Sequence, residues 1–324
     1  MTASGDHQPT RERRRLVPIP VLTGVLAVLG AVVLAVFLAG CGGPSGGSGP
    51  ATSSRSAAPS SGPTYRVTAT VPVGKVPEGV AVDPGTHTVY VTTAKVSTQG
   101  RGPGAATVSV IDGSTRTVTA TVPVGKLPDG VAVDPGSHTV YVTSADDGAV
   151  SVINGSTRTV TATVPVGKNP LGVAVDPGTD TVYVANADDS TVSVINGSTR
   201  TVTATVPVGG LPQGVAVDPG THTVYLTKSE GTTVSVVDAS TRTVTATVPV
   251  GDLPDAVAVD PGSHTVYVAN ANDGTVSVID GSTRTVSATV PVGRRPLGVA
   301  VDPGSHTVYV ANAEDGTVSV IESR

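Results

Sequence analysis

The sequence has few of the side chains that fill a large core or build a catalytic centre. Its 324 residues include no Trp, one Phe, one Met and one Cys, and Phe37 precedes the repeats described below. A single cysteine cannot form an intramolecular disulfide, and it excludes the cysteine pair that attaches haem. The fold must therefore be stabilised by packing alone, with a core of Val, Ala, Thr and a few Tyr.

The abundant residues favour β-structure. Val and Thr are β-branched, which restricts their χ1 angle and suits the pleated surface of a strand. The 39 Gly and 26 Pro are enough to separate many short strands by turns. The composition predicts an all-β protein.

The start of the chain is typical of a bacterial export signal. A basic segment with Arg11 and Arg13–Arg15 precedes the apolar run Leu16–Leu38. This run leads into Leu-Ala-Gly-Cys, which resembles the lipobox of bacterial lipoproteins, and the resemblance implies that Cys41 receives a diacylglyceryl group and becomes the mature N-terminus. The alternative is an uncleaved transmembrane anchor, since a run of this length could span a bilayer.

The chain therefore divides into three predicted regions: a signal peptide over residues 1–40, a linker rich in Gly, Ser and Pro over residues 41–64, and a folded domain over residues 65–324. A flexible linker of this length reaches roughly 25 Å, enough to hold the domain clear of a membrane. Without residues 1–40 the chain keeps 16 basic and 23 acidic residues, which argues against binding a nucleic-acid backbone. We expect a lipid-anchored protein on the outer face of the bacterial cytoplasmic membrane.

One motif recurs six times in the folded domain. Its Gly-Val-Ala-Val core, or Ala-Val-Ala-Val in one copy, has successive starts 51, 42, 42, 42 and 42 residues apart, at Gly79, Gly130, Gly172, Gly214, Ala256 and Gly298. A fixed period of this size is typical of repeat arrays and propellers.

Each repeat contains four predicted strands. In the third repeat they are Leu171–Val175, Thr181–Ala185, Thr191–Ile195 and Thr201–Val208. In the turn that begins at Asp176, Pro is expected to preset φ and Gly to take the positive φ. The first strand is apolar on both faces, which predicts an innermost position, whereas the fourth alternates Thr with apolar residues, as a half-exposed outer strand does.

The ends of the domain predict how the repeats close. The chain opens with a lone fourth strand, Arg66–Val73, and stops at Ile321 after a third strand. The N-terminal strand can therefore complete the last repeat and leave no open seam, which gives a six-bladed β-propeller of four-stranded antiparallel blades. The alternative, an elongated β-solenoid, does not explain the complementary termini.

The repeat also resembles a known family. Gly-Val-Ala-Val-Asp-Pro, Val-Tyr-Val-Ala-Asn and Thr-Val-Ser-Val-Ile-Asp resemble the YVTN-repeat β-propeller family, which is often found on surface and extracytoplasmic bacterial proteins. The resemblance covers Tyr65 to Ile321 and departs from the tetrapeptide itself, which reads Tyr-Val-Thr-Thr at Tyr90 and Tyr-Val-Ala-Asn at Tyr183. It implies a propeller outside the cytoplasm and leaves the activity open.

Polar residues that recur in every repeat are predicted to serve the fold. Asp134, Ser137 and His138 superficially suggest a hydrolytic triad, but the group recurs with little change and adjacent turn residues are badly placed for a relay. The histidines at this position are expected to be rim residues in separate blades, too far apart to share one metal: His87, His138, His222, His264 and His306, with Asp180 in the remaining repeat. The repeated Tyr are expected to pack between blades, and Asn270–Gly274 to form a hairpin turn rather than a calcium loop.

A unique site should lie where the copies differ. One such place is the insertion within Lys95–Ala106 of the first repeat. The other is the loop between successive repeats, which should surround the channel mouth and carries the candidate basic residues Lys75, Lys126, Lys168, Arg294 and Arg295. They share these loops with Glu78, Asp129, Asp252 and Asp255, and they could hold an anionic ligand through guanidinium forks.

These observations favour a non-enzymatic, lipid-tethered propeller that serves as a ligand-binding or protein-interaction scaffold. A propeller enzyme of the lactonase or quinoprotein type is the alternative, and a purely structural or adhesive surface protein is a third. Enzymes need an asymmetric cluster of acids, bases or metal ligands, and near-identical repeats do not supply one. We therefore expect no catalytic residue, metal or cofactor. The expected partners are an envelope protein or a small anion, with the membrane reached through the lipid, no nucleic acid and a monomeric state.

Overall fold

The computed structural model describes residues 71–73, 77–93, 106–315 and 317–322. All regular structure in these ranges is antiparallel β-sheet. Within them no helix has the length and apolar character needed to cross a membrane. The predicted signal peptide, Cys41, the linker, Lys75 and nearly all of the insertion fall outside the described residues.

The strands follow one another in six blades. Blade 1 contains β1 (Pro77–Asp83), β2 (Thr88–Thr93), β3 (Thr107–Asp112) and β4 (Thr117–Pro123). Blade 2 contains β5 (Pro128–Asp134), β6 (Thr139–Ser144), β7 (Ala149–Asn154) and β8 (Thr159–Pro165). Blade 3 contains β9 (Pro170–Asp176), β10 (Thr181–Asn186), β11 (Thr191–Asn196) and β12 (Thr201–Pro207). Blade 4 contains β13 (Pro212–Asp218), β14 (Thr223–Lys228), β15 (Thr233–Asp238) and β16 (Thr243–Pro249). Blade 5 contains β17 (Pro254–Asp260), β18 (Thr265–Asn270), β19 (Thr275–Asp280) and β20 (Thr285–Pro291), and blade 6 contains β21 (Pro296–Asp302), β22 (Thr307–Asn312) and β23 (Thr317–Ile321).

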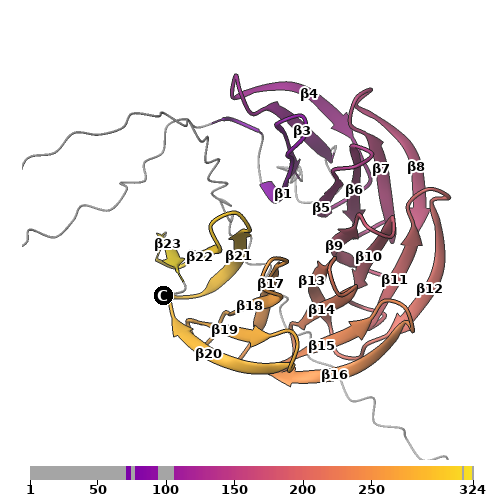
Figure 1. The fold of residues 1–324 in the computed structure, drawn as a ribbon. Helices are drawn as coiled ribbons and strands as arrows, with labels where there is room; N and C mark the ends of the chain where they lie inside the picture. Colours follow the sequence, from indigo (N-terminus) through magenta and orange to yellow (C-terminus); the bar gives the residue numbers. More distant parts are fainter. Residues whose placement is uncertain (1–70, 74–76, 94–105, 316, 323–324) are drawn as a thin grey trace, which may run out of the picture.

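The blades are arranged in a ring (Figure 1). Within each blade the strands pair in sequence order, and the first strands of successive blades, from β1 to β21, lie next to one another around the centre. The first strand is therefore innermost and the fourth outermost, as predicted. The expected fold class, an all-β six-bladed propeller of antiparallel blades, is confirmed; blades 1–5 have four strands each, and the described part of blade 6 has three.

The core lies between the blades rather than within one sheet. Tyr141 of blade 2 packs with Val150 and Val152 of its own blade and with Val182 and Ile195 of blade 3, and its exposed fraction is 1%. Tyrosines of four other blades take part in equivalent clusters: Tyr90, Tyr183, Tyr225 and Tyr267. The predicted packing of these tyrosines between blades is confirmed.

The repeated glycine at the third residue of the inner strand has a steric reason. A Cβ on Gly172 would stand 2.3 Å from the carbonyl oxygen of Gln213 in the next blade, and a Cβ on Gly130 would stand 2.4 Å from that of Leu171. At these positions the lack of a side chain allows the inner strands to approach this closely, whereas blade 5 carries Ala256 at the equivalent position.

The turn after the inner strand differs from the prediction. Positive φ occurs at the fifth residue of the turn motif, for example at His138 (54°) and His264 (55°), whereas Gly136 is not in the left-handed region. His tolerates this region better than most residues but still adopts it at some cost. The expectation that Gly takes the positive φ was therefore wrong: the fifth residue of the turn takes it in all six copies, including Asp180 (50°).

The joint between the last blade and the first lies partly outside the described residues. The Ser109 hydroxyl of β3 donates to the Val73 carbonyl at 3.0 Å, so the end of the predicted N-terminal strand lies beside blade 1. On β23 the side chain of Val320 is 44% exposed, whereas the equivalent Val152 and Val236 are fully buried. Residues 66–70 are outside the described ranges, so completion of blade 6 by this strand stays a prediction.

Candidate functional site

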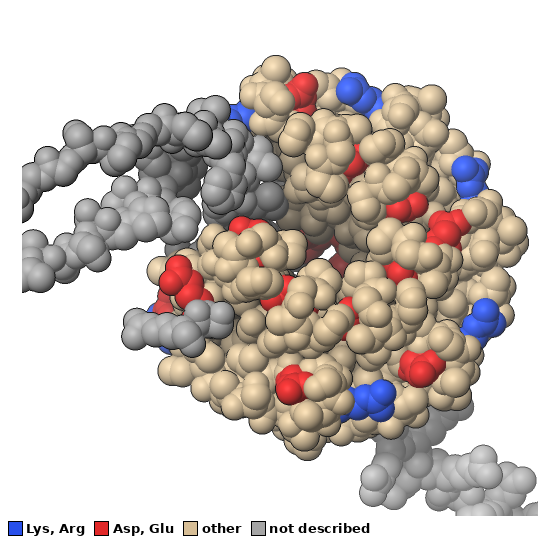
Figure 2. All heavy atoms as spheres, in the orientation of Figure 1, with Lys and Arg blue, Asp and Glu red and all other residues tan. Residues whose placement is uncertain are grey.

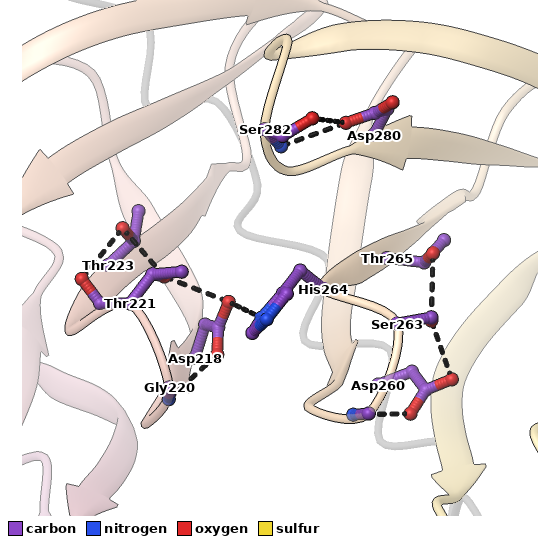
Figure 3. A network of polar contacts seen from close by, with 11 residues as sticks. Asp218, Gly220, Thr221, Thr223, Asp260, Ser263, His264, Thr265, Asp280 and Ser282 are labelled. Carbon is purple, nitrogen blue, oxygen red and sulfur yellow. Dashed lines mark hydrogen bonds and ion pairs between the residues drawn. The ribbon is translucent and has the colours of Figure 1, made fainter.

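The repeated histidines connect neighbouring blades. His138 Nδ1 of blade 2 donates to Asp83 Oδ2 of blade 1 at 2.6 Å. The same bond, at 2.6–2.8 Å, recurs at three further junctions: His222 to Asp176, His264 to Asp218 and His306 to Asp260. Figure 3 shows the His264 ring reaching across to Asp218. These rim residues therefore join the blades, which sequence reasoning did not foresee.

This geometry bears on the apparent triad. Ser137 donates to Asp134 of its own blade at 2.5 Å, while His138 binds Asp83 of the preceding blade. Serine and histidine therefore use different carboxylates, and no Ser–His–Asp relay forms at this turn. The interpretation of these residues as structural is supported by the bonds that they make.

Two of the junction carboxylates, Asp83 and Asp260, have lowered pKa values. Asp83 is fully buried, and burial alone would raise its pKa. Hydrogen bonds from Thr86, His138 and Gly85 outweigh that effect, so the pKa of Asp83 lies below its usual value. The pKa of Asp260 is lowered against the same effect of burial by bonds from its own turn and from the next blade's His306.

One junction departs from the pattern. At the position of the histidine, blade 3 carries Asp180, which accepts a hydrogen bond from Ser198 of its own blade. Asp134 is 6% exposed and keeps its bonds from Gly136 and Ser137, but it receives no bond from the next blade. The junction between blades 2 and 3 thus has two carboxylates where four other junctions have a histidine and a carboxylate.

A second set of links, which the sequence analysis missed, runs along the outer strands. The Arg242 guanidinium donates to the Thr203 carbonyl of the preceding blade at 3.2 Å, and Arg284 donates to the Thr245 hydroxyl at 3.1 Å. Arg158 and Arg200 make the equivalent bonds at 3.4 Å. The signal was present in the sequence as an arginine in every Ser-Thr-Arg-Thr turn.

The predicted basic residues lie on the exposed loops between blades. Lys126, Lys168, Arg294 and Arg295 are all exposed. Lys168 Nζ lies 3.9 Å from Asp189 Oδ1, and Arg294 Nε donates to Asp315 Oδ1 at 2.6 Å. Each carboxylate comes from the second hairpin of the blade that follows the loop, so part of the positive charge is balanced locally. Anion binding by these residues stays a prediction.

The same hairpin carboxylates also hold the loop backbone. Asp147 accepts from the Lys126 backbone N–H at 2.8 Å, and Asp315 accepts from that of Arg294 at 2.7 Å. Asp252 lies on the surface in an equivalent loop, where its N–H donates to Asp273 at 2.8 Å. The hairpin carboxylates Asp147, Asp273 and Asp315 therefore fix the conformation of these loops.

Three of the acidic residues on these loops form a different group. Glu78, Asp129 and Asp255 occupy the second position of the inner strands β1, β5 and β17. Leu171, Gln213 and Leu297 occupy that position in the other blades. Figure 2 shows an opening at the centre of the ring with acidic atoms in its wall, while Lys and Arg lie at the outer edge of that face.

Burial raises the pKa of Asp129 to about 6 and that of Asp255 to about 6. The negative charge of Asp129 raises the pKa of Asp255 further and, after burial, also that of Glu78, whereas Arg295 lowers the pKa of Asp255. Blades 2 and 5 stand on opposite sides of a ring of six, so Asp129 and Asp255 can influence each other only across the channel. Sequence reasoning placed these residues on the loops and missed that they belong to the inner strands.

The backbone of this acidic group is fixed by the blades around it. Thr92 of blade 1 donates to the Asp129 carbonyl at 2.8 Å, and Thr227 of blade 4 donates to the Asp255 carbonyl at 2.7 Å. Gln213 Nε2 donates to Asp255 Oδ1 at 2.6 Å. The Asp129 carboxylate accepts no hydrogen bond from the described part of the chain.

Other candidate sites are occupied by structural bonds. A pocket of about 170 Å³ between blades 3 and 4 is lined by Tyr183, His222 and Arg242, among others, but its histidine and arginine already bind Asp176 and Thr203. The described ranges contain no group of three His, Cys, Asp or Glu side chains that could hold a metal ion. The predicted hairpin at Asn270–Gly274 joins β18 to β19 and is confirmed.

Comparison with known proteins supports the fold alone. No protein-family model and no curated protein matches the chain. Among solved structures it is similar to a chain of Kuenenia stuttgartiensis Hydrazine Synthase, with a TM-score of 0.53 and 18% identity over 81% of this chain and 99% of that one. This identity is too low to transfer an activity.

Proposed function

We propose that this protein is a lipid-tethered, extracytoplasmic propeller that acts as a ligand-binding or protein-interaction scaffold rather than as an enzyme. The observation that carries the proposal is the use made of the chemically versatile side chains. Histidine, serine and aspartate recur at the turns, and at four junctions histidine and aspartate join neighbouring blades. Groups committed in this way support a rigid ring with exposed loops, which suits binding.

Two features of the sequence support the location. The Leu-Ala-Gly-Cys segment resembles a lipobox, which would place two acyl chains on Cys41 and give stable anchoring. The repeat resembles the YVTN-repeat family, whose members often lie outside the cytoplasm. The proposed partner is a protein of the envelope or a small anion at the loops that carry Lys126, Lys168 and Arg294.

A propeller enzyme of the lactonase or quinoprotein type is the second candidate. One observation favours it: Asp129 and Asp255 have pKa values raised to about 6 by burial in the channel, and such carboxyl groups can serve in acid–base catalysis. The absorption spectrum and the metal content of the natively purified protein distinguish the two candidates, because a bound chromophore or metal would favour the enzyme.

The scaffold proposal is tested by capture from native cell envelopes. The acylated full-length chain is used as bait, and the matched control is the same chain after heat unfolding. We expect one or a few partners to be retained by the folded bait and lost with the unfolded control. Failure to retain any partner at low and at physiological salt would contradict the proposal.

A further inference from the structure

We propose that the pocket between blades 3 and 4 binds a carboxylate group that bears a short uncharged chain, held by Arg242, Asn196 and Tyr183. The pocket has a volume of about 170 Å³ and lies where the Asn196 end of β11 meets the adjoining ends of β10 and β12. The predicted basic loops lie at the other end of these strands, beside Pro170 and Pro207. The inference therefore goes beyond the proposed function, which places its partners at those loops.

The pocket has a cause in the sequence. At three junctions a glycine in the turn between third and fourth strands faces the tyrosine of the preceding blade: a Cβ on Gly155 would stand 2.7 Å from the Tyr90 hydroxyl oxygen, and at the other two the distance is 2.9 Å. Blade 4 carries Ala239 instead, and its N–H bond to the His222 carbonyl, at 3.1 Å, is longer than the 2.8–3.0 Å of the equivalent glycines. Because alanine has the Cβ that glycine lacks, its turn must stand farther from Tyr183, and both residues line the pocket.

Tyr183 brings an unpartnered hydroxyl to this pocket. The residue is 2% exposed and lines the pocket, yet its hydroxyl makes no hydrogen bond within the described residues. Burial raises the pKa of Tyr183 to about 12, so the hydroxyl keeps its proton and can donate. A buried hydroxyl without a partner costs free energy, and a ligand oxygen in the pocket would accept its bond.

The lining suits a ligand with negative charge. None of the eleven lining residues, all of them in the described ranges, is acidic, although acidic residues outnumber basic ones in the chain. Asn196 ends β11, whereas β3, β15 and β19 end in Asp112, Asp238 and Asp280. The third strand of blade 2 also ends in Asn but faces Asp180 of the next blade, whereas blade 3 faces a histidine. This junction therefore combines an amide with a histidine.

Two carboxylates near the pocket are already paired. After burial, Asp176 and Asp238 also raise the pKa of the buried tyrosine, so they lie near its hydroxyl. Asp176 accepts a hydrogen bond from His222 at 2.7 Å, and Asp238 accepts one from the Thr241 backbone N–H at 2.7 Å. Neither carboxylate lines the pocket, whereas the Arg242 side chain does.

The structural bonds of the pocket leave donors free. Asn196 Oδ1 accepts from the Thr199 backbone N–H at 2.8 Å, and the amide nitrogen of Asn196 has no partner in the described part of the chain. Arg242 donates one N–H to the Thr203 carbonyl at 3.2 Å, and a guanidinium has five. These bonds fix both side chains in the pocket wall, so their remaining N–H groups can hold a carboxylate in the bidentate geometry that a guanidinium favours.

The size of the pocket and its apolar surface limit the ligand. A volume of 170 Å³ corresponds to the liquid volume of about five or six water molecules. Val194, Ile195 and Ala239 add apolar surface beside the donors. A carboxylate with a short, uncharged chain matches both properties.

Two sources could supply the carboxylate: a free short-chain acid, or the C-terminus of a polypeptide. The full-length chain in detergent is titrated with butyrate and with N-acetyl-alanylalanine, with butyramide as the neutral control, and binding is followed by saturation-transfer NMR of the probe. We expect saturable binding of at least one carboxylate at pH 7.5 and none of butyramide. Tighter binding of butyrate indicates a free acid, and tighter binding of the dipeptide indicates a C-terminus.

Arg242→Gln tests the guanidinium against a matched control. Arg200→Gln removes the same charge and the equivalent bond, from Arg200 to the Thr161 carbonyl, at the preceding junction. We expect Arg242→Gln to lose about tenfold or more in affinity and Arg200→Gln to stay within about twofold, with both folded by circular dichroism. No saturable binding of either carboxylate, equal binding of butyramide, or equal losses in the two variants would overturn the inference.

Two further variants test the pocket itself. Ala239→Gly restores the turn of the other blades and should weaken binding about tenfold without lowering the melting temperature. Tyr183→Phe removes the free hydroxyl and should weaken binding about threefold or more, whereas Tyr225→Phe, at the next junction, should leave the affinity unchanged. Full affinity in both Ala239→Gly and Tyr183→Phe would place the probe elsewhere and refute the site. No envelope extract enters the titration, so its failure leaves the scaffold proposal to the capture experiment.

Discussion

His264 of blade 5 binds Asp218 of blade 4 at 2.8 Å, and this bond crosses a boundary that is otherwise filled by Val and Tyr side chains. The carboxylate is 1% exposed, whereas the imidazole is 43% exposed. A buried charge is therefore held by a donor that remains accessible to water. The histidine also has a positive φ of 55°, which the fifth residue of this turn adopts in every copy of the motif.

The role of the His–Asp bond between blades can be tested at Asp180 and at His264, by adding the bond in one variant and removing it in another. Asp180→His should supply the donor that Asp134 lacks and stabilise the fold by about 0.5–1.5 kcal/mol. His264→Asp should convert a regular junction into one with two carboxylates and cost about 1–3 kcal/mol, since Asp218 would lose its partner. Chemical unfolding at pH 7 measures both changes. A destabilising Asp180→His variant would contradict this account of the junctions.

The channel carboxyls predict a dependence of stability on pH. Asp129 and Asp255 hold their protons more tightly in the folded chain, with pKa values of about 6, than in the unfolded chain, where a value near 3.8 applies. Their contribution to stability is therefore present below about pH 4 and is lost as the pH rises through 6. The variant Asp129→Asn/Asp255→Asn should be more stable than the wild type by about 3 kcal/mol per carboxyl group at pH 7 and nearly equal to it at pH 4.

The junction aspartates act in the opposite direction. Because the pKa values of Asp83 and Asp260 are lowered on folding, they stabilise the fold above the unfolded value and that stability is lost as the pH falls below about 4. Denaturant unfolding across pH 3–8, with Asp146→Asn/Glu230→Gln as the control, separates the two effects. The same pH profile in the channel and control variants would argue against buried, interacting carboxyls.

Much of the fold could be predicted from the repeat itself. The period, the turn residues and the two-sided apolar pattern at Gly172–Val175 are local signals, and each repeat supplies an independent copy of them. The observed β9, at Pro170–Asp176, extends the predicted strand by one residue at each end.

The candidate site was harder to predict from the sequence, because its residues belong to different blades. Asp129 and Asp255 are 126 positions apart in the sequence, and their placement on opposite inner strands of one ring depends on the arrangement of all the blades. The partner of His138 likewise lies in the preceding blade. Arg294 was chosen from the sequence because of its positive charge. Its ion pair with Asp315, which joins the loop before β21 to the hairpin between β22 and β23, is visible only in the folded structure.

Ring closure is tested by two deletions. Removing residues 66–73 should leave β23 without an outer partner and lower the melting temperature by several degrees or more, because its backbone groups and Val320 would face water. Removing residues 42–63, in the predicted linker, should leave the melting temperature unchanged. Equal effects of the two deletions would refute the split blade.

Anchoring depends on Cys41 if the lipobox assignment is correct. Cys41→Ser removes the thiol that would carry the diacylglyceryl group and should abolish labelling by a radioactive or clickable fatty acid. The folded domain should be unaffected, so its melting temperature serves as the control. A Cys41→Ser protein that still incorporates fatty acid would defeat the assignment, and one that stays in the membrane without label would favour the transmembrane anchor.

The last prediction concerns the exposed basic loop before β21. Arg294 already pairs with Asp315, and the partner of an exposed ion pair can be exchanged at little cost because water screens the pair. Arg295 is exposed as well, so both guanidinium groups can reach an acidic surface on an envelope partner. Arg294→Ser/Arg295→Ser should weaken capture of that partner, more at low salt than at high salt, and should leave the melting temperature within about one degree. The control Arg116→Ser removes a positive charge from the exposed turn between β3 and β4, away from this loop. Unchanged capture by the first variant at low salt would remove this face as the partner's binding surface.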